Sequence, residues 1–226
     1  MADPPAEIEE KVSRDDRGRI RERKYTLRGK IEGEYTSYFA NGQVMVQLTF
    51  HNGLKEGEAL SFYPDGQMRE KGYFKNDKLE GEYLSWYENG GLHERENYVN
   101  GLLDGPYFFY FRSGQIRDEE NFRKGKFEGE YRCYYKSGQL REKGAFLNDR
   151  REGPYEAYDR EGNLREKASF RNGKPAGKFT TEGSASGDMG QDRWYSGDGE
   201  ADLEERERSA DNLLKDLQNF NKPGSS

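Results

Sequence analysis

Few side chains in this sequence are of the types that bind metal ions or act as nucleophiles. His51 and His93 are the only histidines, and Cys133 is the only cysteine. A metal site or a nucleophile and its base need several such groups to converge, yet the two histidines occupy different positions in the pattern described below. We therefore expect both to be ordinary surface histidines, and Cys133 to be a small packed side chain in an aromatic strand.

The 43 Asp and Glu residues are numerous enough for an acid–base pair, but many recur at a fixed spacing. A catalytic pair interrupts a regular pattern rather than following it, so we predict a solvated charge ladder that protects the sheet. Walker A, Gly-x-Ser-x-Gly, Cys-x-x-Cys and His-Glu-x-x-His motifs are absent from the sequence. We expect no enzymatic activity, no cofactor and no metal. The recurring acidic residues are Glu70, Glu94, Asp118, Glu142 and Glu166, most of them preceded by Arg69, Arg117, Arg141 or Arg165.

Composition limits the class of protein further. Only 31% of the 226 residues are hydrophobic, and no run approaches the length of a transmembrane helix. The net charge of −6 resides in residues 182–226, because residues 1–181 carry equal numbers of acidic and basic side chains. A near-neutral body argues against nucleic acid as a partner. The first residues contain no secretion signal, so we expect an intracellular, cytoplasmic protein.

Glycines recur every 24 residues and define the elements that must position these side chains. One column occupies 33, 57, 81, 105, 129, 153 and 177, and a second runs in phase from Gly18 to Gly162. A third turn position reads mostly Asn-Gly or Asn-Asp, as at Asn52-Gly53 and Asn76-Asp77. Asn-Gly favours the type I′ turn of a β-hairpin, since both central residues need positive φ. Each unit of 24 residues is therefore predicted to be one hairpin.

The repeated hairpins predict an all-β fold over residues 18–182. Six full units run from residue 33 to 176 with a half unit on each side, giving about fourteen strands in an elongated, twisted, single-layer antiparallel ribbon. The first strand of each unit is aromatic and the second ends in an aromatic residue. Stacked Tyr and Phe columns are expected to line one face and to supply most of the burial.

The repeat resembles a known family. Its consensus, Gly-Glu-Tyr-x-x-Tyr-Phe/Tyr-x-Asn-Gly-Gln-Leu/Met-Arg-Glu-Lys-Gly-x-Phe-x-Asn-Gly-Lys-x-Glu, is similar to the MORN repeat. The likeness is to the longer variant found in proteins of the YwqK antitoxin-like group. This resemblance implies an elongated array of antiparallel β-hairpins that serves as a non-enzymatic platform for protein interaction or assembly.

Two departures from the consensus are candidate partner sites. In residues 44–50 the charged strand becomes Val-Met-Val-Gln-Leu-Thr-Phe, which would place the apolar Val44, Val46 and Leu48 where later repeats have charged residues. We expect these side chains either to bind a partner or to be buried against the N-terminal segment. In residues 107–111 the strand is aromatic on both faces, so at least two rings should lie outside the shared aromatic face, where they either anchor an interface or pack under a terminal segment. Phe108, Phe109 and Phe111 are the candidates there.

The C-terminal part differs in composition from the repeats. Residues 183–201 form a Gly/Ser-rich linker that contains Trp194 and Tyr195, and residues 202–221 are predicted to form an amphipathic helix. The helix either caps the last strand or docks on another protein, and the long linker favours a partner. Residues 1–17 are expected to be disordered or weakly helical, and 222–226 disordered. The apolar stripe of the helix includes Leu203, Leu213, Leu214, Leu217 and Phe220.

These features favour a non-catalytic scaffold or structural component that binds protein partners. One alternative is an antitoxin-like protein that neutralises a toxic partner. Another is peripheral membrane association, against which the near-neutral body and the acidic C-terminal part both argue. The sequence leaves the oligomeric state open.

Overall fold

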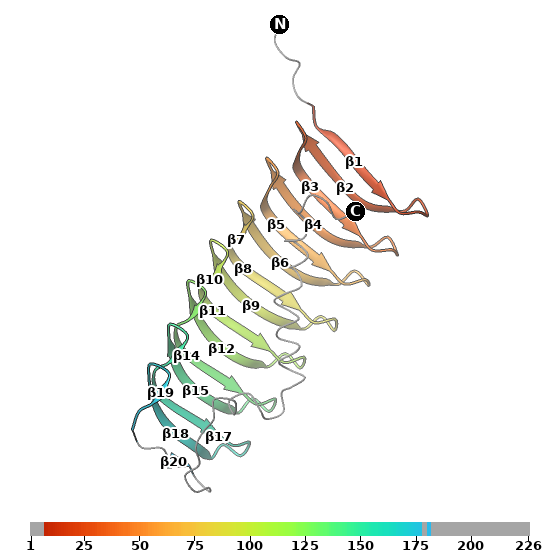
Figure 1. Cartoon of the computed structure of the whole chain (residues 1–226). Helices are drawn as coiled ribbons and strands as arrows, with labels where there is room; N and C mark the ends of the chain where they lie inside the picture. Colours follow the sequence, from red (N-terminus) through yellow and green to blue (C-terminus); the bar gives the residue numbers. More distant parts are fainter. Residues whose placement is uncertain (1–6, 178–179, 182–226) are drawn as a thin grey trace. The chain divides into compact units, whose positions relative to one another are not determined.

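The computed structural model describes residues 7–177 and 180–181, all of which belong to a β-ribbon or its turns. A single sheet of twenty strands contains fourteen strands of six to nine residues and six strands of two residues (Figure 1). Thirteen of the long strands lie within the predicted range of 18–182; the fourteenth, Glu9–Arg14, lies outside it, and the last predicted half unit contributes only Thr180–Thr181. The strands are β1 (Glu9–Arg14), β2 (Ile20–Leu27), β3 (Lys30–Tyr38), β4 (Val44–His51), β5 (Leu54–Phe62), β6 (Met68–Lys75), β7 (Lys78–Leu79), β8 (Gly81–Trp86), β9 (Leu92–Val99), β10 (Leu102–Leu103), β11 (Gly105–Tyr110), β12 (Ile116–Arg123), β13 (Lys126–Phe127), β14 (Gly129–Tyr134), β15 (Leu140–Leu147), β16 (Arg150–Arg151), β17 (Gly153–Tyr158), β18 (Leu164–Arg171), β19 (Lys174–Pro175) and β20 (Thr180–Thr181).

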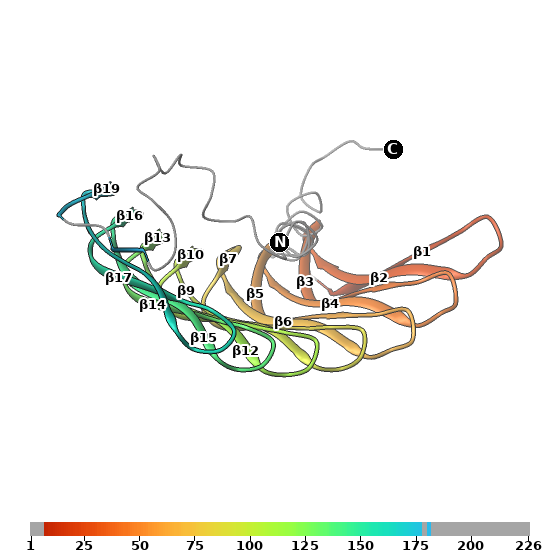
Figure 2. The ribbon, with the colours of Figure 1, turned by 90° about the horizontal axis from the view of Figure 1, so that it is seen from below.

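The long strands form an antiparallel meander in which each pairs with its neighbours in the sequence. Figure 2 shows the strands bent across the ribbon, with the short strands β7, β10, β13, β16 and β19 along one rim. The bends coincide with the first glycine column, whose members have positive φ, such as 78° at Gly81. Glycine is suited to this position because it adopts positive φ without a steric penalty.

The two edges of the ribbon have different turns. Along one edge, Asn52 and Gly53 have φ values of 53° and 85°, as a type I′ turn requires, and six other turns repeat this geometry. Along the other edge, a loop is closed by hydrogen bonds from the amides of Phe39 and Gly42, and within it only the glycine has positive φ. The type I′ prediction is thus confirmed for the Asn52-Gly53 column and wrong for the Asn41-Gly42 column. We call the two edges the type I′ edge and the Gly-loop edge.

A β-bulge follows every turn on the Gly-loop edge. In β8 and β9, Trp86 is opposite Leu92 and Ser85 is opposite Glu94, so His93 has no residue directly opposite. A bulge shifts the alternation of side chains by one position and bends the strand. The corresponding bulged residues of the other hairpins are Arg21, Met45, Arg69, Arg117, Arg141 and Arg165.

Aromatic side chains line one face of the ribbon, as predicted. Tyr35 packs against Phe50 with 6.1 Å between ring centroids, and the equivalent Tyr107 and Phe122 are 5.7 Å apart, both in edge-to-face geometry. Such pairs add about 0.5 to 1.5 kcal/mol to the free energy gained by burial. We call this side the tyrosine face and the other the opposite face.

The N-terminal segment differs from the prediction. Residues 1–17 were expected to be disordered or weakly helical, but Glu9–Arg14 form β1, which pairs with β2. The strand reads Glu-Glu-Lys-Val-Ser-Arg and is exposed throughout, so it is held at the edge of the sheet by backbone pairing and not by a core. Within residues 7–177 and 180–181 no helix is long and apolar enough to cross a membrane. The predicted linker and helix at 183–221 lie outside the described residues.

Candidate functional site: a buried carboxylate ladder

Of the five acidic residues that recur in the second strands and were predicted to be solvated, three are buried, and Glu142 and Glu166 are partly exposed. Glu70, Glu94 and Asp118 are only 2%, 1% and 2% exposed. The expectation was wrong because the bulge shifts the alternation and places these carboxylates on the tyrosine face. The charged residues that do face solvent come one position later and form cross-strand ion pairs on the opposite face, such as Lys71 with Glu58 at 2.6 Å. We call Glu22, Glu70, Glu94, Asp118, Glu142 and Glu166 the carboxylate ladder.

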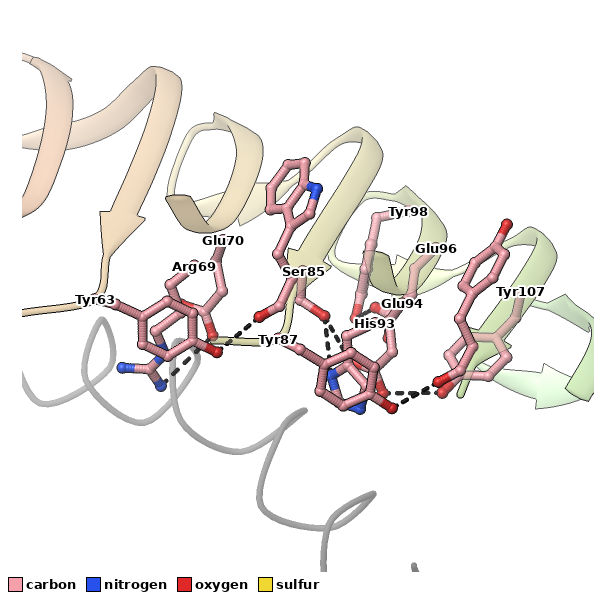
Figure 3. A network of polar contacts seen from close by, with 12 residues as sticks. Tyr63, Arg69, Glu70, Ser85, Tyr87, His93, Glu94, Glu96, Tyr98 and Tyr107 are labelled. Atoms are coloured by element: carbon pink, nitrogen blue, oxygen red, sulfur yellow. Dashed lines mark hydrogen bonds and ion pairs between the residues drawn. The ribbon is translucent and has the colours of Figure 1, made fainter. Parts of the chain in front are cut away.

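Hydroxyl groups from the neighbouring strands donate hydrogen bonds to the ladder. The Tyr107 hydroxyl donates to Glu94 Oε1 at 3.0 Å (Figure 3). In a later repeat, Tyr155 donates to Glu142 at 2.9 Å. On the partner strand of the same hairpin, Ser61 donates to Glu70 at 2.6 Å. Hydrogen bonds of this kind are what make a buried carboxylate tolerable in a protein interior. The ladder therefore joins successive repeats through their side chains.

The tyrosines are held in the form that can donate. Burial raises the pKa of Tyr83 far above its ordinary value, and the nearby Glu70 carboxylate adds to the effect. Burial also raises the pKa of Tyr98, and the Glu96 carboxylate, which accepts a hydrogen bond from the Tyr98 hydroxyl, raises it further. These phenols stay protonated over the whole physiological range. Tyr98 is therefore a fixed donor to Glu96, and neither phenol is suited to act as a general base.

The bulged residue places a cation beside most ladder carboxylates. Arg117 Nε lies 3.4 Å from Asp118 Oδ2, and in the next repeat Arg141 lies 3.7 Å from Glu142. Opposite charges within such a distance offset part of the cost of burying a carboxylate. Sequence analysis missed this arrangement, because without the bulge the two residues would face opposite sides of the sheet.

The first full repeat lacks both members of the pair. Met45 and Val46 occupy the positions of Arg and Glu, so the cation and the carboxylate are replaced together. Val46 and Leu48 are 8% and 3% exposed, and the expectation that residues 44–50 present these side chains to solvent is wrong. They lie on the tyrosine face with Phe50. Val44 is partly exposed and lies on the opposite face with Tyr38.

His93 occupies the bulge position where other repeats have Arg. It is 6% exposed, so it is not a surface histidine, and its ring lies 4.2 Å from that of Tyr87 and 4.7 Å from that of Phe109. Its Nδ1 lies 3.4 Å from Ser85 Oγ and 3.9 Å from Glu94 Oε2 (Figure 3). His51, by contrast, is exposed as predicted.

Ser85, His93 and Glu94 have the residue types of a hydrolytic triad but not its geometry. In such a triad the two imidazole nitrogens contact the serine and the acid separately. Here the same nitrogen faces both groups, and Ser85 Oγ lies 3.2 Å from Glu94, to which it donates. Ser85 is also 3% exposed. The arrangement stabilises a buried carboxylate and leaves no activated nucleophile accessible to a substrate.

Cys133 is a packed side chain, as predicted. It is 6% exposed, and burial raises the pKa of its thiol well above the ordinary value, with the Asp118 carboxylate adding to the effect. The thiol therefore stays protonated and unreactive. Among residues 7–177 and 180–181, no group of three or more His, Cys, Asp or Glu side chains could hold a metal ion.

A second set of carboxylates caps the type I′ turns. Glu80 accepts a hydrogen bond at 2.8 Å from the backbone amide of Asn100, which lies in the turn of the next repeat. The equivalent contact occurs six times in the described residues, always between positions 20 apart. An acidic residue directly before six of the seven glycines of the first column was the sequence signal for this contact. The capping residues are Glu32, Glu56, Glu80, Asp104, Glu128 and Glu152.

The strand at 107–111 is aromatic on both faces, as predicted. Phe108 and Tyr110 are partly exposed on the opposite face. The choice of Phe109 and Phe111 as exposed candidates is wrong, because both are buried, at 1% and 9% exposure. The remaining candidate partner residues lie outside the described part of the chain. They are Trp194, Tyr195, Leu203, Leu213, Leu214, Leu217 and Phe220.

An apolar row runs along the opposite face next to the Gly-loop edge. Each of the six hairpins from β3 to β18 contributes a directly opposed pair of an aromatic and an aliphatic residue, such as Trp86 with Leu92 and Tyr110 with Ile116. No member of the row is fully buried. The pairs are Tyr38 with Val44, Phe62 with Met68, Trp86 with Leu92, Tyr110 with Ile116, Tyr134 with Leu140 and Tyr158 with Leu164.

The row is widest in the middle of the ribbon. Leu60, Leu84 and Phe108 lie beside it on the same face and are partly exposed. In the next two repeats the equivalent positions hold Arg132 and Glu156, which form ion pairs with neighbouring strands. The opposite face is therefore more apolar between β5 and β12 than between β14 and β18.

Solved structures give only weak likenesses. A chain of the Glycosylation Associate Protein (Gap123) complex from Streptococcus agalactiae is 20% identical with a TM-score of 0.28, over 46% of this chain and 19% of that one. A protein of unknown function from Bacteroides fragilis NCTC 9343 is 9% identical with a TM-score of 0.12, over 74% and 94% of the two chains. This chain thus spans about a fifth of the streptococcal chain. Neither likeness carries an argument about function.

A comparison with curated protein sequences gives no match. A family described as MORN repeat variant matches residues 31–52, 55–76, 79–100, 103–124, 127–148 and 151–172. Each matched segment contains one bulged hairpin, and together the six make up more than half of the chain. The chain therefore belongs to the MORN repeat variant family.

Proposed function

We propose that this protein is a non-catalytic scaffold that binds protein partners through the opposite face of its ribbon. The observation that supports this most strongly is the apolar row from Tyr38 to Leu164, whose side chains stay partly exposed over six consecutive hairpins. A contiguous apolar surface with a charged surround is typical of a protein interface. Tyr and Trp, the residue types most common among interface anchors, supply five of the six rings of the row.

The chemistry of the tyrosine face also supports a non-enzymatic role. The acid, serine and histidine side chains that gather there are buried and take part in hydrogen bonds within a hairpin or between neighbouring repeats. A catalytic acid or nucleophile must be reachable by its substrate. Residues that hold the ribbon together in this way are suited to a rigid display surface.

Affinity capture from native lysate with the full chain, followed by quantitative mass spectrometry, tests the proposal. The variant Trp86→Ser/Tyr110→Ser interrupts the row at its widest point. Tyr73→Ser is the matched control, because Tyr73 is 47% exposed on the same face but lies outside the row. Circular dichroism establishes that all the variants are folded.

We expect the double variant to lose partners that the wild type and the Tyr73→Ser control retain. A third variant, Leu213→Ser/Leu217→Ser, separates a role of the predicted C-terminal helix. Loss of partners in this variant alone would contradict binding through the ribbon face, and the absence of any reproducible partner would contradict the scaffold role itself. A single dominant partner that is toxic when expressed alone would favour the narrower antitoxin-like role.

A further inference from the structure

The two edges of the ribbon carry different charges. The seven type I′ turns occupy residues 27–30, 51–54, 75–78, 99–102, 123–126, 147–150 and 171–174, and they contain ten Lys or Arg and only two Asp residues. The seven loops of the Gly-loop edge contain five Lys or Arg and six Asp or Glu over 15–19, 39–43, 63–67, 87–91, 111–115, 135–139 and 159–163. The near-neutral composition of residues 1–181 therefore conceals a basic edge.

The basic side chains of this edge are turned outward. All ten are exposed, and within the residues that the structure describes none of them forms an ion pair. The two aspartates are turned inward, because Asp77 and Asp149 accept hydrogen bonds from the backbone amides of Lys55 and Phe127. The capping carboxylates likewise face the turn amides. The acidic groups next to this edge thus have partners in the backbone, and the cations are available to a ligand.

Cationic and aliphatic turns alternate along the edge. The turns at 27–30, 75–78, 123–126 and 171–174 carry nine of the ten cations. The intervening turns at 51–54, 99–102 and 147–150 carry aliphatic side chains that are 42% to 50% exposed, with Arg150 as the one cation among them. The exposed aliphatic residues are Leu54, Val99, Leu102 and Leu147.

Neighbouring turns lie side by side. A Cβ atom placed on Gly101 would be 3.4 Å from Cβ of Lys78, and one on Gly125 would be 3.6 Å from Leu102 Cδ2. Equivalent turns are two strands apart, which is about 10 Å at the usual strand spacing. Basic groups therefore recur about every 20 Å, with an aliphatic group halfway between them.

From this pattern we infer that the type I′ edge binds an extended, acidic segment of a protein partner. Three residues of extended chain in the polyproline II conformation make one turn, so they span about 9 Å and return the side chain to the same side. A segment with an acidic and an aliphatic side chain alternating at every third residue would therefore match successive turns. A nucleic-acid backbone fits less well, because its phosphates are evenly spaced and offer no apolar group to Leu54 or to the Val99 and Leu102 pair. This inference rests on the proposed scaffold function and names the partner chemistry of one edge.

Fluorescence anisotropy with synthetic peptides tests it on the full chain. The probe is a labelled peptide of about four Glu-Pro-Ser-Leu-Pro-Ser units, in which Glu and Leu alternate about every 9 Å in the extended polyproline conformation. One control peptide has the same composition with its Glu and Leu residues in separate blocks. A second control has Gln in place of Glu.

Charge reversal at the edge supplies the protein variants. Lys75→Glu/Lys126→Glu changes two cationic turns at positions with ordinary backbone geometry. Arg17→Glu/Lys136→Glu is the matched control, because it makes the same change in net charge on the Gly-loop edge. Thermal unfolding followed by circular dichroism confirms that both variants retain the fold.

We expect the alternating peptide to bind more tightly than either control peptide, with an affinity that falls as salt increases. The Lys75→Glu/Lys126→Glu variant should bind the alternating peptide with a Kd that is higher by about tenfold or more. The Arg17→Glu/Lys136→Glu control should change this Kd by less than about twofold. Equal binding of the blocked or Gln peptides, or equal effects of the two variants, would overturn the inference.

Tighter binding of duplex DNA or of phosphatidylserine vesicles than of the peptide, with the same sensitivity to Lys75→Glu/Lys126→Glu, would also overturn it. Those results would assign the edge to nucleic acid or to a membrane surface. Partner capture that depends on Trp86 and Tyr110 would survive each of these outcomes, so failure of the edge and failure of the scaffold role are separable.

Discussion

The Met45 and Val46 pair suggests how a buried ion pair of the ladder can be replaced. We predict that Arg117→Met destabilises the protein strongly and that adding Asp118→Val restores most of the loss. Arg117 and Asp118 have side chains that are 9% and 3% exposed, and 3.4 Å separates the guanidinium from the carboxylate. Removing the cation leaves Asp118 buried with its charge uncompensated by the bulged residue.

The expected size of each effect follows from this burial. Breaking a buried ion pair by removing one partner costs about 3 to 5 kcal/mol, whereas replacing both partners with apolar residues is often neutral. Asp118 lies directly opposite Phe109 on one side and Cys133 on the other, so a valine there gains apolar neighbours. Arg117 also lies 4.9 Å from the Phe109 ring, a contact that the flexible methionine can partly replace. We expect each single variant to lose about 3 kcal/mol and the double variant about 1 kcal/mol.

Urea unfolding followed by circular dichroism and by tyrosine and tryptophan fluorescence measures these free energies, provided that the two probes give coincident curves. Arg165→Met is the control, because Arg165 occupies the same bulge position but is exposed, and it should lose less than about 1 kcal/mol. A double variant that loses as much free energy as the two single variants combined would refute the idea that the cation is present to compensate the carboxylate.

Three further predictions concern single sites. Cys133 should react with a maleimide in urea but not in the native protein, because burial raises the pKa of its thiol. Rapid labelling of the native protein would contradict the packing of this side chain. Glu156 should titrate near pH 2 in carboxylate NMR, because a hydrogen bond from Lys143 is the main cause that lowers its pKa to about 2. The contribution of Glu156 to stability is present above pH 4.5 and is lost as the pH falls towards 2. Titration at the ordinary pKa of a glutamate would contradict this contact. Glu80→Ala should lower the free energy of unfolding by about 1 kcal/mol, because it removes the acceptor for the backbone amide of Asn100. In the same urea assay, Glu80→Gln should lose much less free energy, because the amide oxygen can still accept this hydrogen bond. Equal losses in the two variants would show that the hydrogen bond to the turn is not the cause.

Much of the fold could be predicted from the glycine spacing. A repeat of 24 residues with two turn positions leaves room for only two strands, and the Tyr and Phe columns fall on one face when side chains alternate. The same reasoning identified Cys133 as packed and predicted that some rings of residues 107–111 lie outside the aromatic face, but of the three candidates only Phe108 does so. These features depend on local turn chemistry and on period-two alternation, both of which are visible in a single sequence.

The carboxylate ladder could not be predicted, because its position depends on one extra residue in each strand. A bulge shifts the facing side chains by one position, and Asp118 thereby changes from a predicted surface charge to a residue with 2% exposure. The joint replacement of Arg and Glu by Met45 and Val46 was the available sign that the two positions share one environment. The two turn columns were equally ambiguous, because Asn-Gly occurs both in type I′ turns and in the loops of the opposite edge.

The contacts between neighbouring repeats join residues at fixed distances along the chain, such as 20 positions from Glu80 to Asn100 and 23 from Tyr63 to Trp86. Insertion of one residue within a repeat would misalign every such contact that spans it. Insertion or loss of a whole 24-residue unit would leave all of them intact and would change the length of the ribbon by about 10 Å. The length of this protein is therefore free to change in whole units, by duplication or deletion of a repeat, while its internal geometry resists change by any smaller step.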